Sequence, residues 1–325
     1  MRKNLFEDER MMLRVSDLYY NKNLSQQEIA NKLKISRPTV SKLLSAARDA
    51  GIVTITVSDV NGRKYFQLEQ MIEEKFGLKE VYIVDSTGND AETKDAMGKA
   101  AAQYLSRILK DGDTVGVTMG TSVARIAPNF TGNYHSNLTF VPLIGGVGTV
   151  ANDLHSNYLA EMLAKSYGGI YLPLHTPAMV SRKSTKTELL KENSIQRVFK
   201  KAARMDVALL GIGSPGQNST VTKTGYITSQ MFDEMEAENI CGDICMKFYD
   251  EKGNINKFEE NDKVMSIDLD ILKNVKYAIG IAGGSTKARA IHGAINGGYI
   301  NVLVTDYNCA QVLNQLDAAV PESLQ

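Results

Sequence analysis

The 325-residue sequence has no tryptophan, three cysteines, four histidines and a formal net charge of zero. Three cysteines cannot supply a disulfide framework, and Cys241 and Cys245 do not have the spacing of a CxxC pair. The histidines are scattered along the chain without the spacing of metal ligands. We therefore expect reduced, structural thiols and no metal site.

The chain also lacks any apolar run that approaches the length of a membrane span, and its first residues lack the apolar core of a signal peptide. We therefore expect a soluble, cytoplasmic protein with no membrane partner. With 43% hydrophobic residues the chain can bury a core, and its length suggests two domains rather than one small module.

Residues 24–44 have the pattern of a helix-turn-helix. Ser25 followed by Glu28 predicts a capping box on a first helix. Ser36 predicts the cap of a second helix, whose first turn tolerates Pro38. The second helix turns Val40, Leu43, Leu44 and Ala47 inward and leaves a polar face that offers donors to base edges and phosphates. The expected DNA-binding residues are Ser25, Gln26, Ser36, Arg37, Pro38, Thr39, Ser41 and Lys42.

Three neighbouring features favour a winged helix-turn-helix over an ordinary helix pair. Met11, Val15, Leu18 and Tyr19 have the spacing of a preceding amphipathic helix. The β-branched run 51–57 predicts a strand of a wing. Residues 1–60 hold ten Lys and Arg against seven Asp and Glu, a mild basic bias in a neutral chain. Against it, Lys34 occupies the turn position that is often glycine. We predict a DNA-binding domain at 1–57.

A polar, glycine-containing linker is predicted at 58–64, and a larger domain at 65–325. In this domain a predicted first helix has Tyr65, Leu68, Met71, Ile72 and Phe76 on its apolar side. Near-continuous apolar runs follow, several of them separated by helical stretches, which is typical of parallel strands buried on both faces. The runs are 81–84, 114–118, 138–144, 207–212, 277–282 and 301–305. The fold class is α/β: an open, mostly parallel sheet behind a winged helix-turn-helix.

Four of these runs end in small-residue loops, at 119–122, 145–148, 213–216 and 283–287. In an open parallel sheet the ligand lies beyond the carboxyl ends of the strands, where glycines let backbone N–H groups approach an anion. Lys287 lies in a first helical turn, where the helix dipole disfavours a cation unless an anion is near. The pattern favours a phosphate-type ligand; the alternatives are plain turn glycines and a lysine that extends into solvent. No loop has a Walker A or GxGxxG sequence, so no nucleotide cofactor is indicated.

The chain resembles the SorC family of bacterial sugar-binding transcriptional regulators, which includes the Gram-positive DeoR-type regulators of deoxyribonucleoside use. The resemblance rests on motifs at 25–30, 35–44, 112–121, 142–146, 242–253, 282–287 and 297–306. It implies an effector domain with the fold of ribose-phosphate isomerase and glucosamine-phosphate deaminase, a phosphorylated sugar as effector, and a homotetramer or dimer on a palindromic double-stranded DNA operator.

Matched onto this chain, the resemblance implies that Thr121, Ser122, Gly145, Gly146 and Lys287 hold the phosphate. Asp243 would accept hydrogen bonds from sugar hydroxyls; its alternative role is to cap a turn. With the loop glycines added, the expected effector-binding residues are Gly120, Thr121, Ser122, Gly145, Gly146, Gly148, Gly213, Ser214, Asp243, Gly283, Gly284 and Lys287.

Two residues depart from the family pattern. Met119 replaces an aromatic residue, and Ile144 stands where some relatives carry a lysine that forms a Schiff base, which excludes covalent capture of an aldehyde at that position. The leading hypothesis is a regulator, such as a repressor, of a carbohydrate or nucleoside operon. The alternatives are a sugar-phosphate isomerase or deaminase fused to a DNA-binding module, for which no acid/base pair can be assembled, and a DNA-architectural protein without a ligand.

Overall fold

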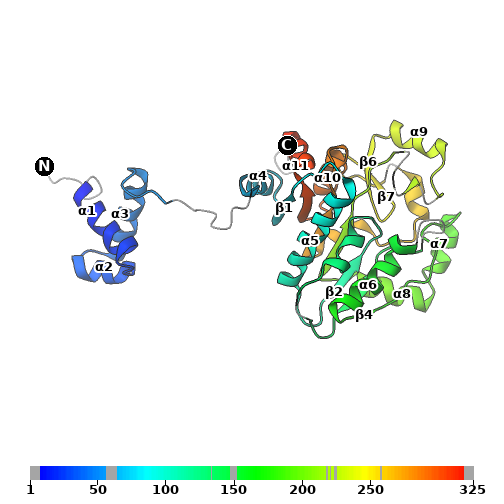
Figure 1. Ribbon diagram of the computed structural model, residues 1–325, viewed down its shortest axis with the longest axis horizontal. Helices are drawn as coiled ribbons and strands as arrows, with labels where there is room; N and C mark the ends of the chain where they lie inside the picture. Colours follow the sequence, from blue (N-terminus) through cyan, green and yellow to red (C-terminus); the bar gives the residue numbers. More distant parts are fainter. Residues whose placement is uncertain are drawn as a thin grey trace. The chain divides into compact units, whose positions relative to one another are not determined.

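The computed structural model describes residues 8–55, 64–132, 134–146, 152–216, 219, 221–222, 225–256 and 258–317. The chain forms two compact units, Met1–Arg63 and Lys64–Gln325 (Figure 1), called here the N-terminal and C-terminal units. Most of the expected linker 58–64 lies outside the described residues. The domain boundaries drawn from the sequence therefore stay a prediction.

The secondary-structure elements in the described part of the N-terminal unit are all helical. Its elements are α1 (Glu9–Ser16), a π-helical turn η2 (Asp17–Asn21), α2 (Gln26–Leu33) and α3 (Arg37–Asp49). The predicted capping box is present: the Ser25 N–H donates to Glu28 Oε2 at 2.8 Å, and the Glu28 N–H donates to Ser25 Oγ at 3.3 Å. Val15, Ile29 and Val40 are fully buried between the helices. Hydrophobic periodicity and the capping residues thus explain where these helices begin and which of their faces is buried.

The strand predicted for the wing at 51–57 is wrong for residues 51–55, which form a turn and a bend; residues 56 and 57 lie outside the described residues. Ile52 and Val53 pack instead against the helical core, and the Val53 N–H donates to Ala47 O at 3.1 Å. The β-branched side chains therefore cover the end of α3. Lys34, at the turn position that is often glycine, has a left-handed φ of 54°. Glycine adopts this conformation readily, which explains why it is common there.

The C-terminal unit contains a seven-stranded, fully parallel sheet in the order β1-β9-β8-β5-β2-β3-β4. Its strands are β1 (Glu80–Val84), β2 (Thr114–Val117), β3 (Thr139–Pro142), β4 (Ile170–Tyr171), β5 (Val207–Gly211), β8 (Tyr277–Ile281) and β9 (Val302–Asp306). Each of the six predicted runs contains a strand. The seventh, β4, was not predicted: it is a two-residue edge strand, and Pro173 interrupts its short apolar stretch at 170–174.

Helices cover both faces of this sheet (Figure 1). They are α4 (Phe66–Phe76), α5 (Asp90–Ile108), α6 (Ser156–Tyr167), α7 (Lys183–Leu189), α8 (Asn193–Ala202), α9 (Ser229–Ala237), α10 (Ala288–Asn296) and α11 (Tyr307–Gln315). Short 3₁₀ turns are η3 (Val123–Arg125), η4 (Ala127–Asn129), η5 (Asn152–Leu154), η7 (Glu259–Lys263), η8 (Leu269–Asn274) and η9 (Ser285–Lys287). Consecutive strand residues belong to separate buried clusters: Phe140 to the one that includes residues of α5 and α6, and Val141 to the one that includes residues of α8 and α10.

The apolar side predicted for α4 needs one correction. Met71 is 49% exposed, whereas Glu69 is buried and accepts a hydrogen bond from the Ile83 N–H at 2.9 Å. The buried side of α4 therefore includes the Glu69 carboxylate, which binds β1, and does not include Met71. Within the described part of the chain, no helix combines the length and apolar character needed to cross a bilayer.

The burial of Phe140 generates a stability prediction. Phe140 is fully buried in β3, so Phe140→Ala should lower the free energy of unfolding of the C-terminal unit by about 3–5 kcal/mol, measured by chemical denaturation. Tyr134 is 74% exposed, and Tyr134→Ala should cost less than about 1 kcal/mol. Equal losses in the two variants would contradict this assignment of the core.

Candidate functional site

A cavity of about 640 Å³ lies at the carboxyl ends of the adjacent strands β2, β5 and β8; we call it the strand-end cavity. Its position is the one expected for a ligand site in an open parallel sheet. It brings together seven of the residues expected from the sequence: Gly120, Thr121, Ser122, Gly213, Ser214, Asp243 and Lys287.

Lys287 reaches this cavity from η9, immediately before α10. Its ammonium group donates to Ile212 O at 2.9 Å. Burial lowers the pKa of Lys287, and the negative charge of Asp243 opposes that shift. An ammonium group has three donors, so the Ile212 carbonyl leaves capacity for a ligand.

Asp243 lies in a strand of a hairpin, not in a turn, so the alternative role as a turn cap does not apply. The hairpin consists of β6 (Ile240–Ile244) and β7 (Lys247–Asp250), and it was not predicted from the sequence. The Gly213 N–H donates to Asp243 O at 2.9 Å, and the Asp243 N–H donates to Gly213 O at 3.1 Å. A Cβ atom on Gly213 would overlap the Asp243 carboxylate. Gly213 is therefore the residue that lets this carboxylate reach the cavity.

The Asp243 carboxyl is only 5% exposed. Burial raises the pKa of Asp243 to about 6, against the opposing effects of the Lys287 charge and the Met246 N–H. Among the described residues no direct ion pair joins Asp243 to Lys287. A ligand in the cavity can therefore accept a hydrogen bond from Lys287 and donate one to Asp243.

The cavity also contains a second lysine that the sequence analysis missed. Lys94 lies in α5, and its Nζ is 2.5 Å from Asp90 Oδ2 one turn earlier. Its positive charge contributes to the lowered pKa of Lys287. The loop from β1 to α5 was not among the four loops expected at the site, although Ser86, Thr87 and Gly88 make it rich in small residues. The signal that could have found Lys94 is the one used for Lys287, a cation near the start of a helix.

The structure does not bring Gly145 and Gly146 to this cavity. The Gly145 N–H donates to Met265 O at 3.0 Å, and the Gly146 N–H donates to Thr176 O at 2.8 Å. A Cβ atom on Gly145 would overlap the carbonyls of Thr176 and Pro177. Close backbone packing thus accounts for Gly145, and the N–H groups of both glycines are already engaged; Gly148 lies outside the described residues.

Gly283 and Gly284 follow β8 but do not line the cavity either. The Gly284 N–H donates to the Asp306 carboxylate, and a Cβ atom on Gly283 would overlap that carboxylate. Gly284 has a φ of 91°, which favours glycine. These two glycines form the turn that places Lys287 at the strand-end cavity.

In the N-terminal unit, α3 presents the predicted polar face. Arg37, Pro38, Ser41 and Lys42 are exposed. The other expected DNA-binding hydroxyls take part in helix caps. The Ser36 and Thr39 hydroxyls are 2.7 Å apart, and the Ser25 hydroxyl donates to Glu28 at 2.8 Å. Gln26 lies partly exposed in the first turn of α2.

Among the described residues, no group of three or more His, Cys, Asp and Glu side chains is placed to hold a metal ion. The three cysteines are free thiols, and Cys245 lines the strand-end cavity. The candidate site therefore consists of two lysines, two carboxylates, hydroxyl groups and backbone amides.

A helix-turn-helix unit joined to a parallel α/β unit with a cavity at its strand ends defines the class of transcriptional regulators with a ligand-binding domain. The Sugar-bind family ("Putative sugar-binding domain") matches residues 60–314, and the MarR family matches residues 18–64. The chain belongs to the SorC family of sugar-binding transcriptional regulators.

Two relatives match over almost their full length. The chain is 33% identical over 316 residues to the sorbitol operon regulator of Klebsiella pneumoniae, covering 94% of this chain and 98% of that protein. It is 33% identical over 310 residues to the deoxyribonucleoside regulator of Bacillus subtilis (strain 168), again covering 94% and 98%. These relatives are named as regulators, and the chain is a regulator rather than an enzyme.

Solved structures agree with this family and with the predicted fold class. The full-length sorbitol operon regulator SorC from Klebsiella pneumoniae superposes with a TM-score of 0.74 at 32% identity, covering 95% of this chain and 100% of that chain. A DeoR family transcriptional regulator from Listeria monocytogenes has a TM-score of 0.70 at 32% identity, covering 77% and 99%.

The raised pKa of Asp243 predicts a pH-dependent stability. The folded state binds this proton more tightly than the unfolded chain, whose pKa is near 3.8. The ionised carboxyl therefore lowers the free energy of unfolding above about pH 6, and this penalty disappears as the pH falls toward about 4. Asp243→Asn should stabilise the protein relative to the parent at pH 8 by on the order of 2 kcal/mol, and by much less at pH 4.5.

Urea denaturation at both pH values measures this difference. Glu74→Gln changes an exposed carboxyl on α4 and serves as the control, with no such pH-dependent gain. A stability difference between Asp243→Asn and the parent that does not change with pH would contradict the assignment.

Proposed function

We propose that this protein regulates a carbohydrate or nucleoside catabolic operon and that a phosphorylated sugar in the strand-end cavity controls its binding to operator DNA. The observation that carries the proposal is the joint placement of Lys287 and Asp243 in one cavity without an ion pair between them. The names of two relatives, regulators of a sorbitol operon and of deoxyribonucleosides, support the class of operon.

The phosphate would lie against Lys287 and the 120–122 loop. A charge-assisted hydrogen bond from a lysine to a phosphate is stronger than one between neutral groups, and backbone amides at a glycine turn add donors. Ser122 is buried at the loop, and Lys94 supplies a second positive charge at the cavity wall. An uncharged sugar would leave Lys287 desolvated without a counter-charge, which favours the phosphorylated form.

The sugar hydroxyls would lie against Asp243. An ionised carboxylate only accepts hydrogen bonds, so it suits hydroxyl donors. Its raised pKa makes this acceptor sensitive to pH, because protonation converts one oxygen into a donor. Ile144 is fully buried, apolar and not among the residues that line the strand-end cavity, so it offers a ligand no covalent attachment.

DNA binding would use α3, whose exposed face meets base edges and phosphates in the major groove. A homodimer or homotetramer would present two such helices to a palindromic operator. Effector control then requires the ligand to bind one arrangement of subunits more tightly than the other, because equal affinity for both shifts nothing.

The effector assignment predicts a ligand-induced stabilisation that depends on Lys287. A sugar phosphate at about 100 times its Kd should raise the free energy of unfolding by about 2.7 kcal/mol, seen as a higher Tm in a thermal-shift panel. Lys287→Ala should lose most of this shift, whereas Lys99→Ala, an exposed lysine on α5, should keep it. A full shift in Lys287→Ala would refute the phosphate site, and no shift with any sugar phosphate would refute the effector class.

The DNA assignment predicts separate effects for two residues of α3. Arg37→Ala should weaken operator binding by about 1–3 kcal/mol if the guanidinium reads a base, and Lys42→Ala should reduce the salt dependence of binding by about one phosphate contact. Gel-shift titration at several salt concentrations measures both. Lys252→Ala, an exposed lysine of the C-terminal unit, is the control. Unchanged operator affinity in Arg37→Ala and Lys42→Ala, with effector response retained, would exclude α3 as the recognition helix.

A further inference from the structure

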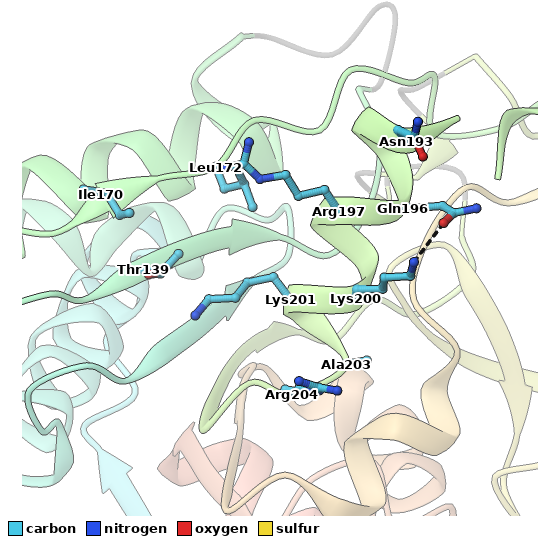
Figure 2. A pocket seen from close by; sticks show the side chains of 10 residues that line it. All are labelled: Thr139, Ile170, Leu172, Asn193, Gln196, Arg197, Lys200, Lys201, Ala203 and Arg204. Atoms are coloured by element: carbon cyan, nitrogen blue, oxygen red, sulfur yellow. Dashed lines mark hydrogen bonds between the residues drawn. The ribbon is translucent and has the colours of Figure 1, made fainter. Parts of the chain in front are cut away.

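A second large cleft lies far from the residues that would hold the effector. It has a volume of about 910 Å³ and runs between α8 and the open edge of the sheet at β3 and β4 (Figure 2); we call it the α8 cleft. Its lining residues are Thr139, Ile170, Leu172, Asn193, Gln196, Arg197, Lys200, Lys201, Ala203 and Arg204. It shares no lining residue with the strand-end cavity.

The α8 cleft is lined by a stripe of positive charge. Arg197, Lys200 and Lys201 lie on one face of α8 at i, i+3 and i+4, and Arg204 follows in the turn after the helix. Ile195, Val198 and Ala202 are buried on the other face. No acidic residue lines the cleft. None of the ion pairs among the described residues includes these four cations, so their charges are not balanced by this part of the chain.

The opposite wall of the cleft is an apolar edge. β4 is the last strand of the sheet, and Ile170 is 65% exposed beside Leu172. The Ile170 and Leu172 N–H groups donate to β3 at Leu138 O (2.8 Å) and Phe140 O (3.0 Å), so the strand is held on one side only. Figure 2 shows Arg197 and Lys201 extending from α8 toward this wall, whereas Lys200 turns to Gln196, 3.0 Å away.

Cations beside an apolar strand edge fit a protein surface better than DNA. DNA phosphates would satisfy the cations, but they offer nothing to Ile170 and Leu172, whereas protein interfaces combine apolar contact with polar groups around it. The partner surface must be acidic. The cleft cannot face its own copy across a twofold axis, because four cations would then oppose four cations.

The described residues contain one helix with the required charge. On α9 and its C-cap, Asp233, Glu234, Glu236 and Glu238 are all exposed, and residues 229–239 include no Lys, Arg or His. Figure 1 shows α9 and α8 well apart in the C-terminal unit, so α9 cannot fill the cleft of its own chain.

We propose that the α8 cleft binds helix α9 of a second copy of this chain. Because each copy has both the α8 cleft and α9, two copies can make this contact reciprocally, with the cleft of each copy binding α9 of the other in a twofold dimer. This assembly contact does not depend on the identity of the effector or the operator.

A charge-swap experiment on the full-length protein tests the proposal. One variant reverses the cleft (Arg197→Glu, Lys200→Glu, Lys201→Glu, Arg204→Glu), another reverses the helix (Asp233→Lys, Glu234→Lys, Glu236→Lys, Glu238→Lys), and a third carries both sets. Sedimentation velocity at low and high salt gives the association constant, and Lys99→Glu on α5 controls for a change of net charge alone. Each one-sided variant should associate at least about tenfold more weakly than the parent, and the double set should restore association.

Several outcomes would overturn the proposal: a monomeric parent, unchanged association in a one-sided variant, or a double set that does not restore association. Loss of operator affinity in the cleft variant without loss of mass would show instead that the cations contact DNA, which also overturns it. Should a fourfold reversal unfold the chain, as seen by circular dichroism, the pair Lys201→Glu and Glu236→Lys, singly and combined, gives the same test with less perturbation.

Discussion

The contact between Asp243 and Gly213 is the constraint on which the strand-end cavity depends. It ties the β6–β7 hairpin to the loop after β5, the central strand of the sheet, through two backbone hydrogen bonds. The carboxylate fits only because residue 213 has no side chain. The same contact holds a buried negative charge opposite Lys287, and isolated charges in such surroundings cost several kcal/mol unless they are paired. A ligand that forms hydrogen bonds with both Asp243 and Lys287 would offset part of the free-energy cost of burying these charges.

The hairpin that carries Asp243 has a backbone cost of its own. Its two-residue turn consists of Cys245 and Met246, with φ values of 55° and 57°. Left-handed backbone costs a non-glycine residue roughly 1–2 kcal/mol, and such turns usually contain Asn or Gly. Packing offsets the cost here, since Cys245 and Met246 are both buried. The tight turn sets the register of the hairpin and therefore the position of Asp243.

The long, buried elements of this fold can be predicted from sequence because burial on both faces leaves a continuous apolar run. The central strands and the face of α5 are of this kind. The edge strand β4 has two residues, in a short apolar stretch that Pro173 interrupts. The hairpin turns at Cys245 and Met246, which are not typical turn residues. The site was predictable in part. Lys287 is a cation at a helix start, where the helix dipole disfavours it, and this is visible in the sequence, as it is for Lys94. The role of Gly145 depends instead on contacts with Thr176, Pro177 and Met265, which are distant in the sequence.

The strand-end cavity is connected to the rest of the C-terminal unit through α10. Lys287 is the residue directly before this helix, so a force on its ammonium group acts on the helix start. The helix is fixed to the hairpin: the Tyr249 hydroxyl donates to Ala290 O at 3.0 Å, and a Cβ atom on Gly293 would overlap Asp250 O. Lys287 and Asp243 thus belong to two elements that pack against each other. A sugar phosphate bound to both groups, as proposed, would act on α10 and the hairpin as one packed pair, and packed interfaces shift between discrete arrangements rather than deform continuously.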